Sequence, residues 1–301
     1  MLFNSIEFAV FLPIAFLLYW FVFGGNAKTQ NLLLLVVSYV FYAWWDWRFL
    51  GLIAFTTLTT FFSGLLIGKY RSQQFGLQTS ESPIGGGENR SKARAVSAAN
   101  IIVNLGVLAV FKYYNFFVSS FAALIPGLSG DRLLLNIILP VGISFYTFQA
   151  LSYSIDVYKG KIDPTRDIVA FFAYVSFFPQ LVAGPIERAT NLLPQFERQR
   201  TFNYEEAVDG MRRILWGLFK KIVVADNCAT YVDQVWNNYT NECGSTLALA
   251  AILFAFQIYG DFSGYSDIAI GSAKLFGIRL KDNFLPPYFS RNVAEFWKRW
   301  H

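Results

Sequence analysis

The chain has 301 residues, of which 54% are hydrophobic, 19% aromatic and only 15% charged, and its mean hydropathy is +0.38. This composition is too apolar for an ordinary soluble domain and indicates a polytopic membrane protein. The net charge of +5 does not indicate nucleic-acid binding, because the cations fall in short links between apolar runs, as the positive-inside rule predicts for a membrane protein.

The N-terminal part contains three apolar runs, at residues 6–23, 32–45 and 49–68. Each is long enough, or nearly so, to cross a bilayer as a helix of about 20 residues. The links between the runs are short, so the helices are expected to be antiparallel neighbours. The N-terminus lacks the basic stretch of a signal peptide, so the first run is predicted to remain as a span. Gly64 and Gly68 precede Lys69, and they are predicted to be a helix-packing pair rather than part of a phosphate loop.

Residues 69–94 are rich in Ser, Gln and Gly and carry five cations against two anions. This stretch is predicted to be a flexible cytoplasmic loop. Three crossings separate it from the N-terminus, which is therefore expected on the extracytoplasmic side.

A further span is expected at residues 95–111, followed by an interfacial aromatic segment at residues 113–128. Residues 133–158 are predicted to be a helix kinked by Pro140 and Gly142. Its polar side chains, Gln149 among them, are tolerated at membrane depth only inside protein or along a water-filled cavity.

Residues 167–185 hold two prolines and a glycine within seven residues, which predicts a broken or re-entrant segment. Residues 205–224 have the pattern of an interfacial amphipathic helix. On this interpretation its cations face lipid headgroups; they are Arg212, Arg213, Lys220 and Lys221. A basic helix that merely anchors the protein is the alternative.

The apolar run at residues 247–259 leads into a polar stretch, residues 260–267, that contains Asp261 and Asp267. Carboxylates in lipid are costly, so both should meet water, a partner cation or a substrate path. For Asp261 two interpretations stay open, a polar funnel wall and a structural helix cap.

The last residues predict a short interfacial amphipathic helix after Pro286 and Pro287, capped by Ser290 or Asn292. Its apolar face carries aromatic residues, and its polar face carries cations that suit lipid phosphates. The chain's one histidine, His301, follows the helix with no residue that would end it, so the sequence is interpreted as a C-terminally truncated fragment of a longer chain.

Hydrolase, zinc-protease and dinucleotide-binding patterns are missing, and neither Cys228 nor Cys243 belongs to a C-x-x-C pair. No metal site and no bound cofactor are therefore expected. An imidazole takes a proton from a hydroxyl near neutral pH, which is what acyl transfer to an alcohol requires. On composition alone, however, a lone terminal histidine is more often incidental.

Several motifs occur together along the chain. They are LPVGISFYTFQ at 139–149 with IDVY at 155–158, FPQLVAGPIER at 178–188, KK at 220–221 with ADN at 225–227, FQIYGDFSGYSDIAIG at 256–271, NF at 283–284 with PY at 287–288, and EFWKRWH at 295–301. In this order they resemble the membrane-bound O-acyltransferase (MBOAT) family, in its bacterial branch of alginate-O-acetylase-like proteins. The resemblance covers nearly the whole chain.

The resemblance implies one all-α membrane domain over residues 1–301, incomplete at its C-terminus, with helices around a central funnel in the bacterial inner membrane. It implies transfer of an acyl group, commonly acetyl, from a cytoplasmic donor such as acetyl-CoA or an acyl carrier protein to hydroxyls of an extracytoplasmic polysaccharide such as alginate. Lipid and periplasmic or membrane acetylation proteins are the implied partners.

His301 matches the first of the family's two active-site histidines. The second lies beyond this sequence, so the fragment alone is expected to be inactive. Trp297 and Trp300 are expected around a tunnel mouth, and Gln149, Asp261 and Tyr265 are expected to line the substrate tunnel.

Two other classes remain open from the sequence. Broken helices and intramembrane carboxylates also mark transporters and channels. A non-catalytic membrane scaffold for polysaccharide machinery is the third class. A second histidine in an apolar setting about 30 to 40 residues after His301 would favour the enzyme.

Overall fold

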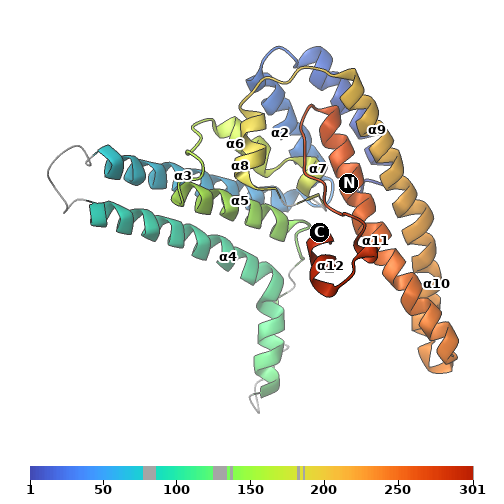
Figure 1. The fold of residues 1–301 in the computed structure, drawn as a ribbon. Coiled ribbons are helices and arrows are strands. Elements are labelled where there is room, and N and C mark those ends of the chain that lie inside the picture. Colours follow the sequence, from blue (N-terminus) through green and yellow to red (C-terminus); the bar gives the residue numbers. More distant parts are fainter. Residues whose placement is uncertain (77–85, 125–133, 136–137, 182–183, 186, 301) are drawn as a thin grey trace. The chain divides into compact units, whose positions relative to one another are not determined.

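The computed structural model describes residues 1–76, 86–124, 134–135, 138–181, 184–185 and 187–300, and the regular elements within them are all helices (Figure 1). Three of the described helices are long and apolar enough to cross a membrane, namely Trp47–Ser72, Gly87–Phe121 and Gly244–Leu275. Shorter apolar helices span Ile6–Val22 and Ile168–Leu181. The part of the chain that is described is therefore all-α, with helices that suit a bilayer.

The chain divides into two compact units, and each is assembled from segments far apart in the sequence. The first comprises Met1–Val37, Phe177–Glu187 and Arg198–His301, and the second comprises Ser38–Ser176 and Arg188–Glu197. The boundary passes through the second helix, α2 (Ala27–Ala43). A single membrane domain over residues 1–301 stays a prediction.

The second unit contains the end of α2 and a set of helices in which α3 contacts both α4 and α5. These elements are η2 (Trp47–Phe49), α3 (Leu50–Gly76), α4 (Gly86–Leu124), α5 (Ile143–Tyr158), α6 (Ile168–Val175) and α8 (Ala189–Phe196). A Cβ on Gly64 would lie 2.6 Å from Cε1 of Tyr153, and one on Gly68 would lie 2.3 Å from Cγ of Pro164. The prediction of a helix-packing pair is confirmed for Gly64, which meets α5, whereas Gly68 meets Pro164 in the segment between α5 and α6.

Helix occupies both ends of the stretch at residues 69–94 that was predicted to be a flexible loop. Helix α3 continues to Gly76 and α4 begins at Gly86, and the residues between them lie outside the described part. The polar residues at these helix ends are helix formers, and Lys92 pairs with Glu88 one turn away at 2.6 Å. A polar composition was therefore mistaken for flexibility.

The sequence also predicted two segments at residues 95–111 and 113–128, where the structure has one helix as far as Leu124. Figure 1 shows that α4 bends toward its C-terminal end rather than breaking. The kinked helix predicted at residues 133–158 begins only at Ile143. Pro140 lacks an N–H, and Gly142 adopts φ 73°, so the helix starts after them.

The broken segment near residues 167–185 contains two short helices. Helix α6 ends at Val175, and α7 (Phe178–Leu181) follows after a two-residue break in the other unit. Asp167 caps α6, because its side chain accepts hydrogen bonds from the backbone N–H groups of Val169 and Ala170. A re-entrant path stays a prediction.

The first unit is organised around the 32-residue helix α11 (Gly244–Leu275). Its other elements are α1 (Ile6–Leu17), η1 (Leu18–Val22), the start of α2, α7, α9 (Tyr204–Leu218), η4 (Phe219–Ala225), α10 (Asp226–Asn237), η5 (Tyr239–Asn241), η6 (Pro287–Phe289) and α12 (Val293–Arg299). Trp20 donates through Nε1 to the carbonyl of Leu275 at 2.9 Å, and the Tyr19 hydroxyl donates to the carbonyl of Phe276 at 3.1 Å. These bonds join η1 to the end of α11.

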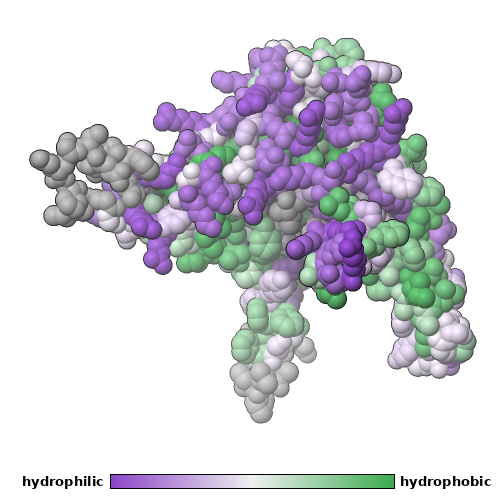
Figure 2. Space-filling model, in the orientation of Figure 1, coloured by the Kyte–Doolittle hydropathy of each residue, from purple (hydrophilic) through white to green (hydrophobic). Residues whose placement is uncertain are grey.

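Large apolar side chains remain exposed on the helices of this unit. Leu215 is 70% exposed on α9, and Ile252 is 56% exposed on α11. Figure 2 shows hydrophobic side chains over the limb formed by α10 and α11, whereas hydrophilic side chains cover much of α12. An apolar exterior of this kind suits contact with lipid tails.

Candidate active site

The segment after α11 turns back along that helix and is held at three consecutive residues. The backbone N–H of Lys281 donates to the buried carboxylate of Glu187. Asp282 pairs with Arg213 at 2.6 Å, and the Asn283 amide donates to the Ser266 hydroxyl at 2.8 Å. These contacts fix the approach of the chain to α12.

Helix α12 is short, and its start is fixed by side-chain caps. Of the two predicted cap residues, the structure uses Asn292, whose side chain accepts from the N–H of Glu295 at 2.8 Å. Ser290 instead donates to the carbonyl of Pro287 at 2.6 Å. The backbone N–H of Arg291 donates to the Glu295 carboxylate, and this bond, with the attraction of Arg299, holds the pKa of that carboxyl below its usual value.

Trp300 ends α12 and belongs to an aromatic cluster on α11. Its ring stacks on Phe296 with centroids 5.5 Å apart, and meets Phe284 edge-on at 5.1 Å. Tyr288 lies between these rings and α11, because its hydroxyl donates to the carbonyl of Ala255 at 2.6 Å. The cluster therefore attaches the end of α12 to the membrane-spanning helix.

Trp297 is placed differently from Trp300. It is 65% exposed and lines a hollow of about 460 Å³ on the outer side of α12. Val293 is also exposed, at 72%. The predicted apolar face is therefore divided: Phe296 and Trp300 pack in the aromatic cluster, whereas Val293 and Trp297 are exposed. The helix ends at Arg299 because Trp300 adopts extended backbone angles, φ −81° and ψ 128°.

Charged side chains of α9 and η4 pair with carboxylates of α11. Asp267 accepts from Nε of Arg213 at 3.0 Å and also receives the ammonium group of Lys220. Lys221 lies 2.7 Å from Asp261 and 2.8 Å from Asp226. The prediction that the two carboxylates meet a partner cation is confirmed for both.

The prediction that the cations of residues 205–224 face lipid headgroups is wrong for three of the four. The side chains of Lys220 and Lys221 are only 14% exposed and that of Arg213 is 26% exposed, and all three turn toward α11. Both lysines lie in η4, a π-helical turn, which is a distortion found frequently at functional sites. Arg212 is exposed and has no ion pair among the described residues.

Glycines allow the two helices to approach closely enough for this pairing. A Cβ on Gly217 would lie 2.6 Å from the carbonyl oxygen of Gly264, and one on Gly271 would lie 2.5 Å from that of Gly210. Neither gap can hold a methyl group. The backbones therefore touch, and the charged side chains reach across beside them.

The predicted tunnel residues are distributed between the two units. Asp261 lies in the middle of α11 with its side chain 38% exposed, so the helix-cap interpretation is wrong. The Tyr265 hydroxyl donates to Asn4 at 3.3 Å, and its ring lies 5.4 Å from the Lys221 ammonium. Gln149 belongs to the second unit, is 2% exposed and donates to the carbonyl of Tyr174 at 2.8 Å. His301 lies outside the described residues.

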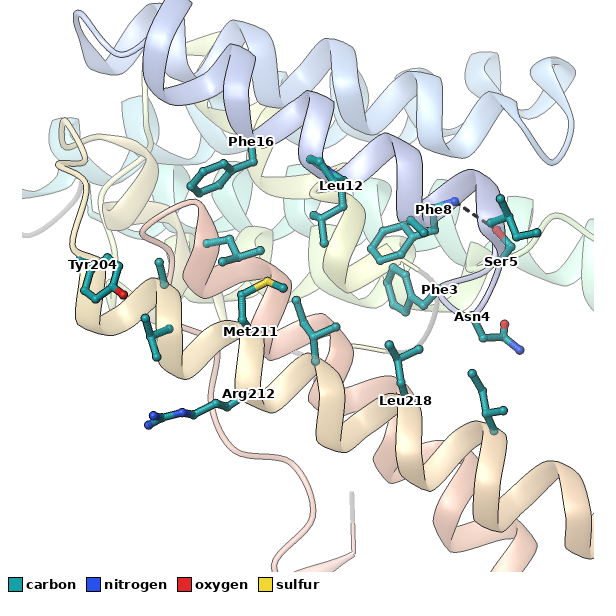
Figure 3. Close-up of a pocket in the computed structure, with 18 of the residues that line it drawn as sticks. Phe3, Asn4, Ser5, Phe8, Leu12, Phe16, Tyr204, Met211, Arg212 and Leu218 are labelled. Carbon is teal, nitrogen blue, oxygen red and sulfur yellow. Dashed lines mark hydrogen bonds between the residues drawn. The ribbon is translucent and has the colours of Figure 1, made fainter.

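A separate apolar groove of about 890 Å³ runs between α1 and α9 (Figure 3). Leu12 and Phe16 project into it from α1, and Met211 and Leu218 project from α9, while the Arg212 side chain points away. None of the predicted tunnel residues lines this groove.

Sequence reasoning missed Glu187 and the role of Asp267 as a double acceptor. Arg213 and Lys220 are seven residues apart and so share a helix face, and this spacing was a usable signal that they have a common partner. The periodicity of one helix does not predict that this partner, Asp267, lies on another helix about fifty residues later.

Helices that are long and apolar enough to cross a membrane, with paired charges and an aromatic cluster packed against one of them, define an integral membrane protein. Residues 162–301 match the sequence profile of MBOAT, the membrane-bound O-acyltransferase family. Residues 162–301 therefore belong to this family, and the bacterial proteins that resemble the whole chain include probable alginate O-acetylases.

Relatives align along the entire chain. It is 39% identical over 303 residues to the probable alginate O-acetylase AlgI of Azotobacter vinelandii, and 38% identical to the probable alginate O-acetylase AlgI of Pseudomonas aeruginosa. It is 31% identical to a peptidoglycan O-acetyltransferase of Helicobacter pylori. All three alignments cover 100% of this chain but only 56%, 54% and 59% of the relatives, so the chain spans a little over half of their length.

Proposed function

We propose that the full-length protein is an O-acyltransferase that transfers an acetyl group to hydroxyls of an extracytoplasmic polysaccharide such as alginate. The observation that supports this most strongly is the 31–39% identity, over the whole chain, to proteins named as acetylases or acetyltransferases of two different polysaccharides. Both relatives modify glycans.

His301 is proposed as the general base. In the reaction it accepts the proton of an acceptor hydroxyl, and the oxygen attacks the carbonyl carbon of an acyl thioester. The C–O ester bond forms as the C–S bond breaks, and the thiol leaves with a proton. Trp300, which precedes His301 in the chain, packs against Phe284 and Phe296.

The acyl donor is proposed to be acetyl-CoA or an acyl carrier protein on the cytoplasmic side of the inner membrane. In this orientation the linker between α3 and α4 is cytoplasmic and the protein crosses the membrane several times. The proposed partners are periplasmic or membrane proteins that continue the acetylation. We propose that the helices surround a funnel lined by Gln149, Asp261 and Tyr265, with Trp297 and Trp300 at its mouth.

The test is chemical analysis of the polysaccharide. Cells with the gene deleted should lose acetyl ester from their exopolysaccharide, and the intact gene supplied on a plasmid should restore it. Unchanged ester in the deletion strain would contradict the proposal. Accumulation of an intact solute by purified protein in vesicles, without ester formation, would instead identify a transporter.

A further inference from the structure

A basic cavity of about 560 Å³ lies in the second unit, where α3, α4 and α5 meet. The cations that line it are Arg71 of α3, Arg90 of α4 and Lys159, which directly follows α5. No carboxylate is among the described residues that line it. Three helix ends therefore bring like charges together around one hollow.

The charge at this cavity is only partly balanced. Arg71 pairs with Asp163 at 2.6 Å, but that carboxylate is 89% exposed. Neither Arg90 nor Lys159 forms an ion pair within the described part of the chain. Like charges repel, so the cavity favours an anion over an empty state.

Hydrogen bonds to the backbone hold the residues that form the cavity in place. Arg71 is held by the carbonyl of Val157 at 2.7 Å, in the last turn of α5. The chain then reverses at Gly160, whose φ of 74° and 3.1 Å bond to the same carbonyl close the helix. This turn presents Lys159 beside Arg71.

The other side chains that line the cavity are apolar or amphipathic. Ile67 is 0% exposed and Ala93 is 6% exposed, and Tyr158 adds an amphipathic ring. Ile67 and Arg71 lie within the membrane-spanning helix Trp47–Ser72, near its end, and Arg90 and Ala93 lie within the first turns of Gly87–Phe121. The cavity thus sits where helices leave the hydrocarbon, with cations beside an apolar surface.

We propose that this cavity binds the phosphate headgroup of an anionic phospholipid, from the leaflet that is cytoplasmic in the orientation proposed above. A lipid matches this position, because its phosphate meets the cations while its acyl chains lie along the apolar helices Trp47–Ser72 and Gly87–Phe121, whose ends form the cavity. Basic pockets between membrane helices on the cytoplasmic side are typical sites for such headgroups. The volume also exceeds what a single inorganic phosphate fills.

The experiment titrates the purified full-length protein in detergent with dioleoylphosphatidylglycerol or dioleoylphosphatidylcholine and counts bound lipid by native mass spectrometry. The wild type should bind phosphatidylglycerol more tightly. Each cation near a membrane surface contributes about a fivefold factor in affinity, so the double variant Arg90→Gln, Lys159→Gln should bind it about thirtyfold more weakly. Arg71 is left intact because it also closes α5.

The matched control is Arg94→Gln, Arg166→Gln, which removes the same charge from exposed residues that do not line the cavity. It should change the affinity less than about threefold, the range of ordinary context effects on one surface charge. The single variants Arg90→Gln and Lys159→Gln should each show about a fivefold loss, which keeps the test valid if the double variant misfolds.

Soluble anions distinguish the source of the phosphate. Inorganic phosphate or glycerol 3-phosphate at millimolar concentration should not displace the bound lipid. The proposal is overturned if these soluble phosphates compete as well as the lipid, if the cavity variants bind phosphatidylglycerol like the wild type, or if the control variant loses as much affinity. An acidic carrier protein that displaces the lipid with higher affinity would also overturn it.

Discussion

Asp267 is the carboxylate on which the packing of α9 against α11 depends most. It lies between two cations, Arg213 and Lys220, and its side chain is 12% exposed. Charges that are largely removed from water are stable only while they are paired. Such a carboxylate supports the fold rather than the chemistry, and it is distinguished from Asp261, whose side chain is 38% exposed.

Replacing Asp267 with Asn should leave the largely buried Lys220 without its counter-charge and Arg213 with Asp282 alone. We expect a loss of about 3 kcal/mol in the free energy of unfolding, measured in detergent by tryptophan fluorescence. The control Glu88→Gln breaks an exposed pair with Lys92 and should cost at most about 1 kcal/mol. Equal losses in the two variants would show that Asp267 is not specially placed.

The thiol of Cys243 has a lower pKa than an ordinary cysteine, which the sequence did not indicate. It precedes the first residue of α11, and hydrogen bonds with the Ser245 and Thr246 hydroxyls lower the pKa of its thiol to about 7. A lowered pKa means that the thiolate is present above pH 7, and is lost as the pH falls below that value.

Alkylation of Cys243 in a Cys228→Ser background should therefore reach half of its maximal rate near pH 7. Removing both hydroxyls, with Ser245→Ala and Thr246→Val, should move this midpoint upward toward the ordinary thiol value of 9.0. The rate is followed by mass spectrometry after iodoacetamide treatment. A midpoint that is the same with and without the hydroxyls would refute their role.

At the scale of elements, α12 is a seven-residue helix whose position depends on contacts at both ends. An isolated helix of this length is not stable in water. Asn292 caps its start, and its last carbonyl, that of Arg299, accepts from the N–H of Leu285 at 3.0 Å. The geometry around His301 should therefore be sensitive to the cap.

Asn292→Ala should weaken α12 by about 1 kcal/mol, the usual value of a capping side chain. Since this is large for so short a helix, acetyl transfer by the full-length protein should fall severalfold, with kcat affected more than KM. Asn292→Asp keeps the acceptor oxygen and should retain activity. Ser290→Ala, at the other predicted cap, should be close to wild type, and activity equal in all three variants would contradict the role of the cap.

The sequence correctly predicted the elements whose structure is determined by the local pattern of apolar and small residues. The apolar runs near the N-terminus and at α11 are helices, and Gly64 packs closely against α5 as expected. The errors lie where a distant partner decides the outcome. Lys220 was assigned to lipid headgroups because its own helix is amphipathic, whereas Asp267, 47 residues later, holds it inside the unit.

The candidate site shows the same division. Trp300 was predicted on an apolar face and does pack among rings, but Phe284 and Tyr288 come from a loop whose path no periodicity describes. That path depends on Glu187 and Ser266, which hold Lys281 and Asn283. Long-range hydrogen bonds of this kind are not encoded in local spacing.

At the scale of the whole molecule, the apolar helix α11 is followed by a segment that is held back along it and by the short capped helix α12, which precedes His301. The loop and α12 have no membrane-spanning length of their own, so they take their position from α11. If His301 is the general base proposed above, a fixed α12 would favour catalysis, because acyl transfer needs its reacting groups held in position.

The most direct test measures acetyl ester on the exopolysaccharide of deletion cells that express either the wild-type protein or His301→Ala. Loss of a general base typically lowers rates by 10² to 10⁴, so the variant should give ester close to the level of the deletion strain while its amount in the membrane stays normal. Lys298→Ala, on the exposed side of α12, serves as the control and should give wild-type ester. Near-normal ester with His301→Ala would contradict the account.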